Sequence, residues 1–386
     1  MTVNLMHTEQ ETEQKPKNDI ERIIWSHKSE VGPIFVIFAG VHGNETAGLE
    51  ACEHIAAALE ARKDEIQGSV YMIRGNKKAI QEEVRYIDFD LNRIWNNLDS
   101  GANELSESAE WEEAHELKEL INHIIGRYSD DMKEIYFIDL HTTSAKSCAF
   151  IPFNDTLENR RIALRFPVPQ ILGIEESIHG TLLSYINDLG YPAIGFEAGS
   201  HTDPLSVERT EAFLWIYLDF VSIVNLEIKK LRQLEEKLRP EAKIPIKYYE
   251  INHHYLVEDP ELFRMKKGYV NFDSVRKGGF LAYDKNQRIE APVSGFIFMP
   301  LYQKKGNDGF FILKGRSPFW LEMSSIFRDS FINNYLHYLP GVEELEPGTY
   351  TVNLTIARFF VKEVFHLLGY RVIRKDENKL ICYKRV

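Results

Sequence analysis

Between residues 34 and 220, short runs of apolar residues alternate with longer stretches that have the periodicity of amphipathic helices. This alternation constrains the fold more than any other feature, because strands that alternate with helices form a sheet covered by helices. The expected strands are residues 34–39, 70–73, 135–140, 148–152 and 193–196. The expected helices are residues 45–62, 109–125, 181–189 and 205–238. We therefore predict an α/β domain.

The rest of the chain has a different texture. Residues 1–22 are polar and lack the apolar core of a signal peptide, so we expect them to form a flexible tail. The last expected helix loses its apolar density before Pro240, so we expect the α/β domain to span residues 23–240. Residues 241–326 hold short strand-like runs broken by glycines, which predicts a small, barrel-sandwich-like β domain. Residues 327–386 mix strands at 350–354 and 380–383 with a helix at 356–368, and whether this α+β extension is a separate unit stays open.

The charge balance excludes several classes of partner. The chain has 46 Lys and Arg against 58 Asp and Glu, a formal net charge of −12, so no overall positive field attracts nucleic acid or anionic lipid. Four glutamates between residues 110 and 116 are interpreted as a solvated helix face.

The most apolar stretch, residues 212–226, is too short to span a membrane and has a polar stripe, as in a buried amphipathic helix.

The cysteines indicate the cellular compartment. Cys52, Cys148 and Cys382 are far apart in the sequence, which excludes a disulfide framework and a thiolate zinc site. We therefore expect a cytoplasmic protein with neither nucleic-acid nor membrane partners. Whether the chain forms a homo-oligomer stays open.

Residues 40–45, GVHGNE, directly follow the first expected strand and precede a helix. Open α/β sheets bind ligands at the carboxyl edge of their strands. His42 and Glu45 are three residues apart across this turn, and an imidazole with a carboxylate is a favoured pair of zinc ligands. The alternative is a glycine turn with a glutamate at the start of a helix, where the helix dipole favours it.

A third ligand decides between these interpretations, because catalytic zinc sites use three protein ligands and one open position. His141 follows the expected strand 135–140 and so lies at the same edge of the sheet as His42. Asp139, two residues earlier, is placed to orient a histidine ring. A histidine at a strand end is by itself more often a hydrogen-bonded structural residue, but its pairing with His42 and Glu45 favours a metal site.

Two further segments carry groups suited to catalysis. In residues 85–93, RYIDFDLNR, two arginines and an asparagine can polarise a carbonyl and bind a carboxylate, while Asp88 or Asp90 holds a guanidinium. A solvated charged strand would look similar. In residues 193–201, AIGFEAGSH, Glu197 ends an apolar strand, where an apolar pocket would suit it to transfer a proton. The alternative is an acidic residue at a turn before a helix.

The segments GVHGNE, RYIDFDLNR, DLHTTS and FEAGSH, in this order, resemble the motifs of the succinylglutamate desuccinylase and aspartoacylase family, which is related to zinc carboxypeptidases. The resemblance covers about residues 34–220, and the β segment after residue 243 is similar to the family's C-terminal domain. It implies a carboxypeptidase-like mixed sheet flanked by helices. It also implies one zinc ion per chain, on His42, Glu45 and His141.

The resemblance further implies catalytic and substrate-binding residues. These are Glu197 as general base and acid, Arg85 for polarising the carbonyl, and Asn92 with Arg93, supported by Asp90, for a substrate carboxylate. We therefore expect a zinc hydrolase that removes the acyl group from a small, carboxylate-bearing N-acyl amino acid, or from an N-acyl amine, by means of a metal-activated water.

Other activities are weighed against this expectation. Between residues 177 and 191 the chain lacks the arginine with which aspartoacylase grips the aspartate side chain, which argues against aspartoacylase activity itself. A zinc carboxypeptidase acting on peptide C-termini would use the same chemistry, but in the resembling family the β domain narrows the entrance to small substrates. A zinc-binding scaffold without turnover is the other alternative, and the presence of Glu197 and Arg85 argues against it.

Overall fold

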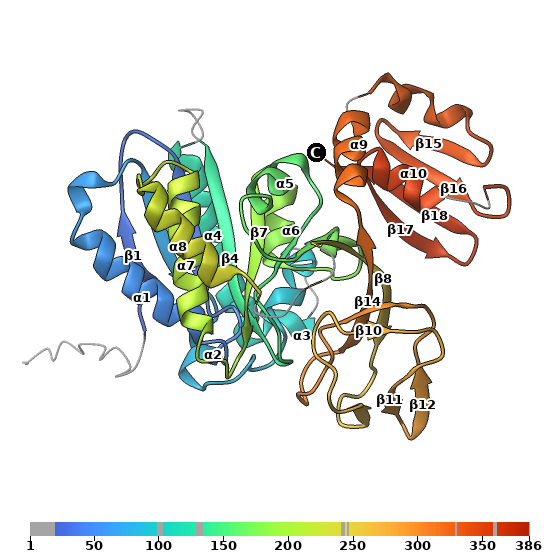
Figure 1. Ribbon diagram of the computed structural model, residues 1–386, viewed down its shortest axis with the longest axis horizontal. Helices are drawn as coiled ribbons and strands as arrows, with labels where there is room; N and C mark the ends of the chain where they lie inside the picture. Colours follow the sequence, from blue (N-terminus) through green and yellow to red (C-terminus); the bar gives the residue numbers. More distant parts are fainter. Residues whose placement is uncertain are drawn as a thin grey trace, which may run out of the picture.

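The fold is built around one long mixed sheet (Figure 1). The computed structural model describes residues 20–98, 103–128, 134–240, 244, 247–328, 330–357 and 361–385, so most of the predicted tail lies outside the described residues. The strands of the long sheet, in order across it, are β1 (Ile23–His27), β3 (Ser69–Arg74), β2 (Ile34–Ala39), β4 (Ile135–Thr143), β7 (Ala193–Ser200), β5 (Ile151–Phe153), β6 (Gln170–Leu172), β8 (Tyr248–Leu256), β14 (Asp308–Arg316), β13 (Gly295–Phe298) and β10 (Ser274–Val275).

The centre of this sheet confirms the predicted α/β class. Strands β3, β2, β4 and β7 run parallel, whereas β1 pairs antiparallel with β3, and β5 pairs antiparallel with β7, which makes the sheet mixed. Four of the five predicted strands are present, with ends that differ by a few residues. The fifth, predicted at 148–152, begins only at Ile151, and Phe150 before it forms an isolated bridge to Glu197.

Helices cover both faces of the sheet, because alternate residues of each central strand are apolar on opposite sides. Phe35 of β2 packs with α1 (Ala47–Glu60) and α7 (Ser206–Phe220), while Val36 packs with α4 (Ala109–Tyr128) and α6 (Leu182–Asp188). The shorter helical segments here are η1 (Lys63–Glu65), α2 (Lys77–Gln81), η2 (Leu91–Arg93), η3 (Trp95–Asn97), α3 (Asn103–Ser106), α5 (Leu157–Ala163) and η5 (Ile174–Glu176). None of the helices in the described ranges is long and apolar enough to cross a membrane.

The single helix predicted over residues 205–238 is wrong. The chain forms two helices, α7 and α8 (Ile228–Leu238), with a sharp turn between them. Ser222 adopts a left-handed φ of +62°, and the carboxylate of Asp219 accepts a hydrogen bond from the backbone N–H of Leu226 at 2.8 Å. The apolar pattern continues through the turn because Leu234 of α8 packs into the same core as α7.

The predicted β segment extends the long sheet. β8 joins it by a parallel pairing with β6, and β14, β13 and β10 follow in antiparallel order. A second sheet has the order β12 (Gln287–Glu290), β11 (Phe280–Asp284), β9 (Phe263–Met265). Between them lies a core that includes Phe263, Leu281 and Phe310. A small antiparallel β region is therefore present, as expected.

The last part of the chain forms a layer of its own, which we call the C-terminal unit (described residues within 318–385). It contains α9 (Pro318–Arg328), η6 (Phe331–Tyr338), α10 (Val361–Leu367) and an antiparallel sheet in the order β15 (Val342–Glu346), β16 (Thr349–Asn353), β18 (Lys379–Lys384), β17 (Tyr370–Asp376). Its core includes Tyr350, Phe365 and Tyr370. The predicted helix 356–368 is present from Val361, and residues 358–360 lie outside the described ones. In Figure 1 this orange and red unit stands beside α5 and α6.

Candidate functional site

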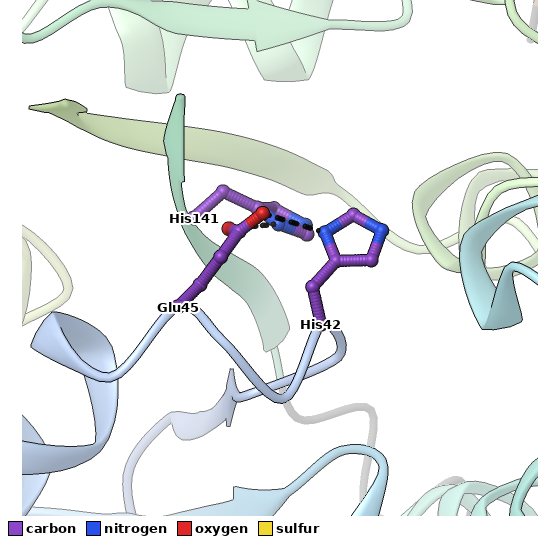
Figure 2. Close-up of side chains that lie close together, drawn as sticks. All are labelled: His42, Glu45 and His141. Carbon is purple, nitrogen blue, oxygen red and sulfur yellow. Dashed lines mark hydrogen bonds and ion pairs between the residues drawn. The ribbon is translucent and has the colours of Figure 1, made fainter. Parts of the chain in front are cut away.

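His42, Glu45 and His141 meet at the carboxyl edge of the long sheet. β2 and β4 are neighbouring parallel strands in which Ala39 pairs with Leu140, so the turn after β2 and the end of β4 lie side by side. The three side chains are buried and can each offer one ligand atom, all within 4.8 Å of one another. Figure 2 shows the Glu45 carboxylate facing both rings, with a dashed line from the carboxylate to each.

The hydrogen bonds of the two histidines orient both rings in the same way. The Nδ1 atoms of His42 and His141 lie 2.8 and 3.0 Å from the Glu45 oxygens. The Nε2 atoms face other carboxylates, Asp90 at 3.1 Å from His42 and Asp139 at 2.6 Å from His141. A carboxylate behind each imidazole is the arrangement that fixes metal-binding histidines. The donor set of two imidazoles and one carboxylate, so oriented, fits a zinc ion.

The tight turn that carries His42 depends on two glycines. Gly40 has a φ of +73°, a left-handed conformation that glycine adopts without strain. A Cβ on Gly43 would lie 2.0 Å from the backbone carbon of Ala79 in α2, so only glycine fits there. The GxHG pattern is therefore explained by the left-handed φ of Gly40 and by the close approach of Gly43 to the backbone of α2.

Arg85 and Asp90 form an ion pair next to the three residues. The Arg85 guanidinium lies 2.9 Å from Asp90 and 3.5 Å from Glu45. Burial raises the pKa of Asp90, but Arg85 and His42 outweigh it and hold this pKa well below its usual value. Burial also raises the pKa of Glu45, but His42 and His141 lower it by more and hold this pKa well below its usual value. Both carboxylates are therefore anionic.

Asn92 and Arg93 lie at the same cavity, but both are engaged within the protein. The Asn92 side chain accepts a hydrogen bond from the backbone N–H of Leu182 at 2.9 Å and so fixes the start of α6. The Arg93 guanidinium pairs with Asp308 of β14 at 2.6 Å. Where the sequence predicts a substrate carboxylate, the structure places a carboxylate of the protein.

Glu197 lies on β7 opposite His141, its register partner on β4. Burial, together with the nearby Glu45 and Asp139, raises the pKa of Glu197 to about 8, although His141 and Arg85 act in the opposite direction. Its Oε2 atom is buried and has no hydrogen-bond partner among the described residues. Such a carboxyl group is suited to exchange a proton with a reacting molecule.

Seven of the eight predicted site residues, all but Asp90, line one cavity with a volume of about 120 Å³. Besides these polar groups, the lining includes the apolar side chains of Ile174, Ile178 and Leu183 from the α/β part. Met299, Leu301 and Phe311 from the β region also line it. The cavity therefore combines reactive polar groups with an apolar lining that can contact an apolar part of a ligand.

The acidic run in α4 does not form a solvated face, which corrects that prediction. Glu110 is fully buried, and its carboxylate accepts hydrogen bonds from the consecutive backbone N–H groups of residues 87–89, at 2.7 to 3.0 Å. It thereby holds the segment that carries Arg85 and Arg93. Only part of the run, such as Glu112, faces solvent.

Sequence reasoning also missed residues that approach the site from far along the chain. Asp308 is 215 residues from Arg93, and its other oxygen lies 2.8 Å from Nε2 of His254. His201 lines the cavity, and its Nδ1 lies 2.8 Å from the hydroxyl oxygen of Thr142. It is the last residue of the FEAGSH segment, four residues after Glu197, but the sequence alone assigned it no role.

The fold and this site together define an α/β protein with a buried His-Glu-His centre at the carboxyl edge of its sheet. Residues 31–221 match the family model described as the succinylglutamate desuccinylase/aspartoacylase catalytic domain. The chain thus belongs to this family, which confirms the resemblance seen in the sequence and supports its assignment to a deacylase family of hydrolases.

Individual relatives agree with the family match. The chain is 28% identical to the succinylglutamate desuccinylase of Pseudoalteromonas atlantica over 286 residues, which cover 71% of this chain and 78% of that protein. It is 35% identical to the aspartoacylase of Rattus norvegicus over 118 residues, but these cover only 30% of this chain and 36% of that enzyme. The crystal structure of a succinylglutamate desuccinylase/aspartoacylase from Rhodobacter sphaeroides has the same fold, with a TM-score of 0.56 and 16% identity over 76% of this chain and 88% of that one.

Proposed function

We propose that this protein is a zinc-dependent deacylase that hydrolyses the amide bond of a small N-acyl amino acid or N-acyl amine. The observation that carries the proposal is the convergence of His42, Glu45 and His141 beside Glu197 in one cavity. The family membership supports the same reaction class. The free cysteines are consistent with a reducing cytoplasm, which we propose as its location.

The proposed cofactor is one zinc ion per chain, held by His42, Glu45 and His141. When bound, zinc supplies Lewis-acid activation of water and of the amide carbonyl. Asp90 and Asp139 keep the Nδ1 atoms of the two rings directed at the site.

Glu197 is the proposed proton carrier. Water adds to the amide carbon while Glu197 takes up its proton, and the C–N bond breaks as Glu197 returns a proton to the departing nitrogen. The products are a carboxylic acid and an amine. Burial explains why this carboxyl group holds a proton near neutral pH, and a zinc ion nearby would lower its pKa toward the working range.

Arg85 is proposed to stabilise the negative charge that develops on the carbonyl oxygen, a role that typically lowers a barrier by roughly 3 kcal/mol. Its ion pairs with Asp90 and Glu45 hold the guanidinium in place. Asn92 and Arg93 stay the proposed contacts of a substrate carboxylate, which would have to share Arg93 with Asp308.

The proposal is tested with purified, zinc-loaded protein and a panel of N-acetyl and N-succinyl amino acids, N-acyl diamines and short peptides, followed by amine release. We expect turnover of at least one small N-acyl compound and about one zinc per chain by elemental analysis. His42→Ala should lose the metal, whereas His54→Ala, at an exposed position on α1, should retain it. Full activity in metal-free protein, or activity on peptides alone, would overturn the proposal.

A further inference from the structure

The C-terminal unit is attached to the α/β part through buried charges. Arg385, at the end of the unit, lies 2.8 Å from Glu175 and 2.7 Å from Glu176 of η5. All three side chains are 6% exposed or less. Gly173, just before η5, makes room for this contact, because a Cβ there would lie 3.2 Å from the guanidinium.

Other residues of the same unit reinforce this attachment. His366 lies 2.9 Å from Glu176, and the backbone N–H of Val372 donates to the same carboxylate at 3.0 Å. The guanidinium of Arg371 donates to the backbone carbonyl of Glu175 at 2.8 Å. The cations that contact these two carboxylates in the described structure, Lys362, His366 and Arg385, all come from the C-terminal unit.

The segment held in this way is also a wall of the cavity. Ile174 and Ile178 flank the two glutamates in sequence, and both line the cavity that contains Glu45 and Glu197. The backbone N–H of Ile178 donates to the carbonyl of Ile174 at 2.9 Å, so residues 174–178 form one compact turn. One side of this turn faces the cavity and the other side faces the C-terminal unit.

Two adjacent buried carboxylates keep this conformation only while they are paired. A buried charge that loses its partner is strongly destabilised and turns toward water. If Glu175 and Glu176 turned outward, the turn would rearrange and carry Ile174 and Ile178 away from the cavity.

We infer that Arg385, assisted by His366 and Arg371, is a positioning residue that fixes the wall formed by Ile174 and Ile178. The C-terminal unit thereby determines which substrate groups the cavity accepts. The inference rests on the proposed function in one respect, namely that this cavity binds the substrate.

The test compares Arg385→Ala with Arg385→Lys and with Arg374→Ala. Arg374 lies on β17 of the same unit, is exposed, and in the described structure donates to the carbonyls of Asp376 and Glu377 in its own hairpin, so it is the matched control. The first measurement is hydrogen exchange of residues 173–180, which needs no activity. We expect loss of protection in Arg385→Ala, partial rescue in Arg385→Lys, and no change in Arg374→Ala.

The second measurement uses two substrate series, one with a fixed amine and acyl groups of increasing size, the other with a fixed acyl group and varied amines. Arg385→Ala should raise KM for the larger members of at least one series by about ten- to a hundredfold, because a displaced wall no longer positions them. The smallest substrates should keep their KM, and kcat and zinc content should change little.

Unchanged protection of residues 173–180 in Arg385→Ala would overturn the inference, as would lost protection with an unchanged KM pattern in both series. If Arg385→Ala does not fold, Arg371→Ala takes its place, because it removes only the hydrogen bonds to the Glu175 carbonyl and to the His179 ring, and the same two measurements apply. If wild-type protein hydrolyses no N-acyl compound, the proposed function fails, while the exchange experiment still decides whether Arg385 holds the turn.

Discussion

The carboxylate of Asp308, on β14, lies 2.6 Å from the guanidinium of Arg93, on η2, at the cavity that also contains Glu197. The β region thus places a negative charge on the arginine that is proposed to bind the substrate. Both side chains are partly exposed, so a substrate can reach them. A substrate carboxylate would compete with Asp308 for Arg93.

Asp308→Asn should therefore lower KM for carboxylate-bearing substrates a few-fold relative to neutral analogues. The change is small because a partly exposed ion pair is worth at most about 1 kcal/mol. Steady-state kinetics on a matched acid and amide pair measures it. Glu261→Gln, which removes an exposed partner of Lys304, should have no effect. An equal rise in KM for both substrates would mean that Asp308 orients Arg93 without competing for it.

Glu197→Gln should keep the zinc content and the substrate affinity but lose activity. The amide has nearly the shape of the carboxyl group and cannot carry the proton, and general acid–base catalysis is typically worth roughly 10² to 10⁴ in rate. Single-turnover rates and elemental analysis of the same sample measure both effects. A variant that keeps more than about a tenth of kcat would exclude Glu197 as the proton carrier, and a variant without zinc would identify it as a ligand.

The parts of the fold and site that could be predicted are those governed by local pattern. Strand β2 was expected at its observed residues because its apolar run ends at a glycine. His42 and His141 could be placed at one sheet edge because both follow parallel strands, and the structure brings them together with Glu45. Their zinc binding remains a proposal.

The parts that could not be predicted depend on contacts between distant segments. Asp308 reaches Arg93 from 215 residues away, and nothing near Asp308 in sequence indicates it. The burial of Glu110 on α4 could not be predicted, because in the sequence Glu110 does not differ from its solvated neighbours. Its acceptor role depends on three backbone N–H groups that only the fold brings to it. The attachment of Arg385 to Glu175 is equally invisible without the fold.

Glu110→Ala should destabilise the protein and disturb the site together. It would leave the part-buried backbone N–H groups of residues 87–89 without their acceptor, which is expected to cost about 2 to 3 kcal/mol of unfolding free energy. The segment 85–93 would lose its anchor, so kcat/KM should also fall. Chemical denaturation and kinetics measure the two effects. Glu112→Ala, whose exposed carboxylate contacts Lys78, is the control, and equal behaviour of the two variants would refute the anchoring role.

Asp139→Asn should weaken zinc binding while leaving all three proposed ligands in place. Asp139 is fully buried and lies 2.6 Å from Nε2 of His141, and removal of such a partner typically lowers metal affinity 10- to 100-fold. Competition with a chelator measures the affinity. Asp88→Asn alters a carboxylate that accepts the backbone N–H of Ala109 and should leave the affinity unchanged. Wild-type affinity in Asp139→Asn would show that the ring needs no such support.

The docking of the C-terminal unit should depend on pH through His366. Burial lowers the pKa of His366, but Glu176 and Glu250 outweigh it and raise this pKa above its usual 6.5. Protonated His366 therefore stabilises the folded state fully below pH 6.5, and this contribution is lost as the pH rises through the higher folded-state pKa. Burial raises the pKa of Glu176, yet His366 and Arg385 bring it down from 4.5 to about 2, so its contribution is full above pH 4.5 and is lost as the pH falls toward 2.

His366→Gln should consequently lower the urea midpoint of the C-terminal unit most at about pH 6, and the difference from wild type should shrink in alkaline solution. The midpoint is followed by the hydrogen-exchange protection of β17 and β18, which report on this unit alone. His123→Gln, at an exposed position on α4, should show no pH-dependent difference. A difference between His366→Gln and wild type that stays constant with pH would mean that His366 acts through packing and neutral hydrogen bonds, without a contribution from its charge.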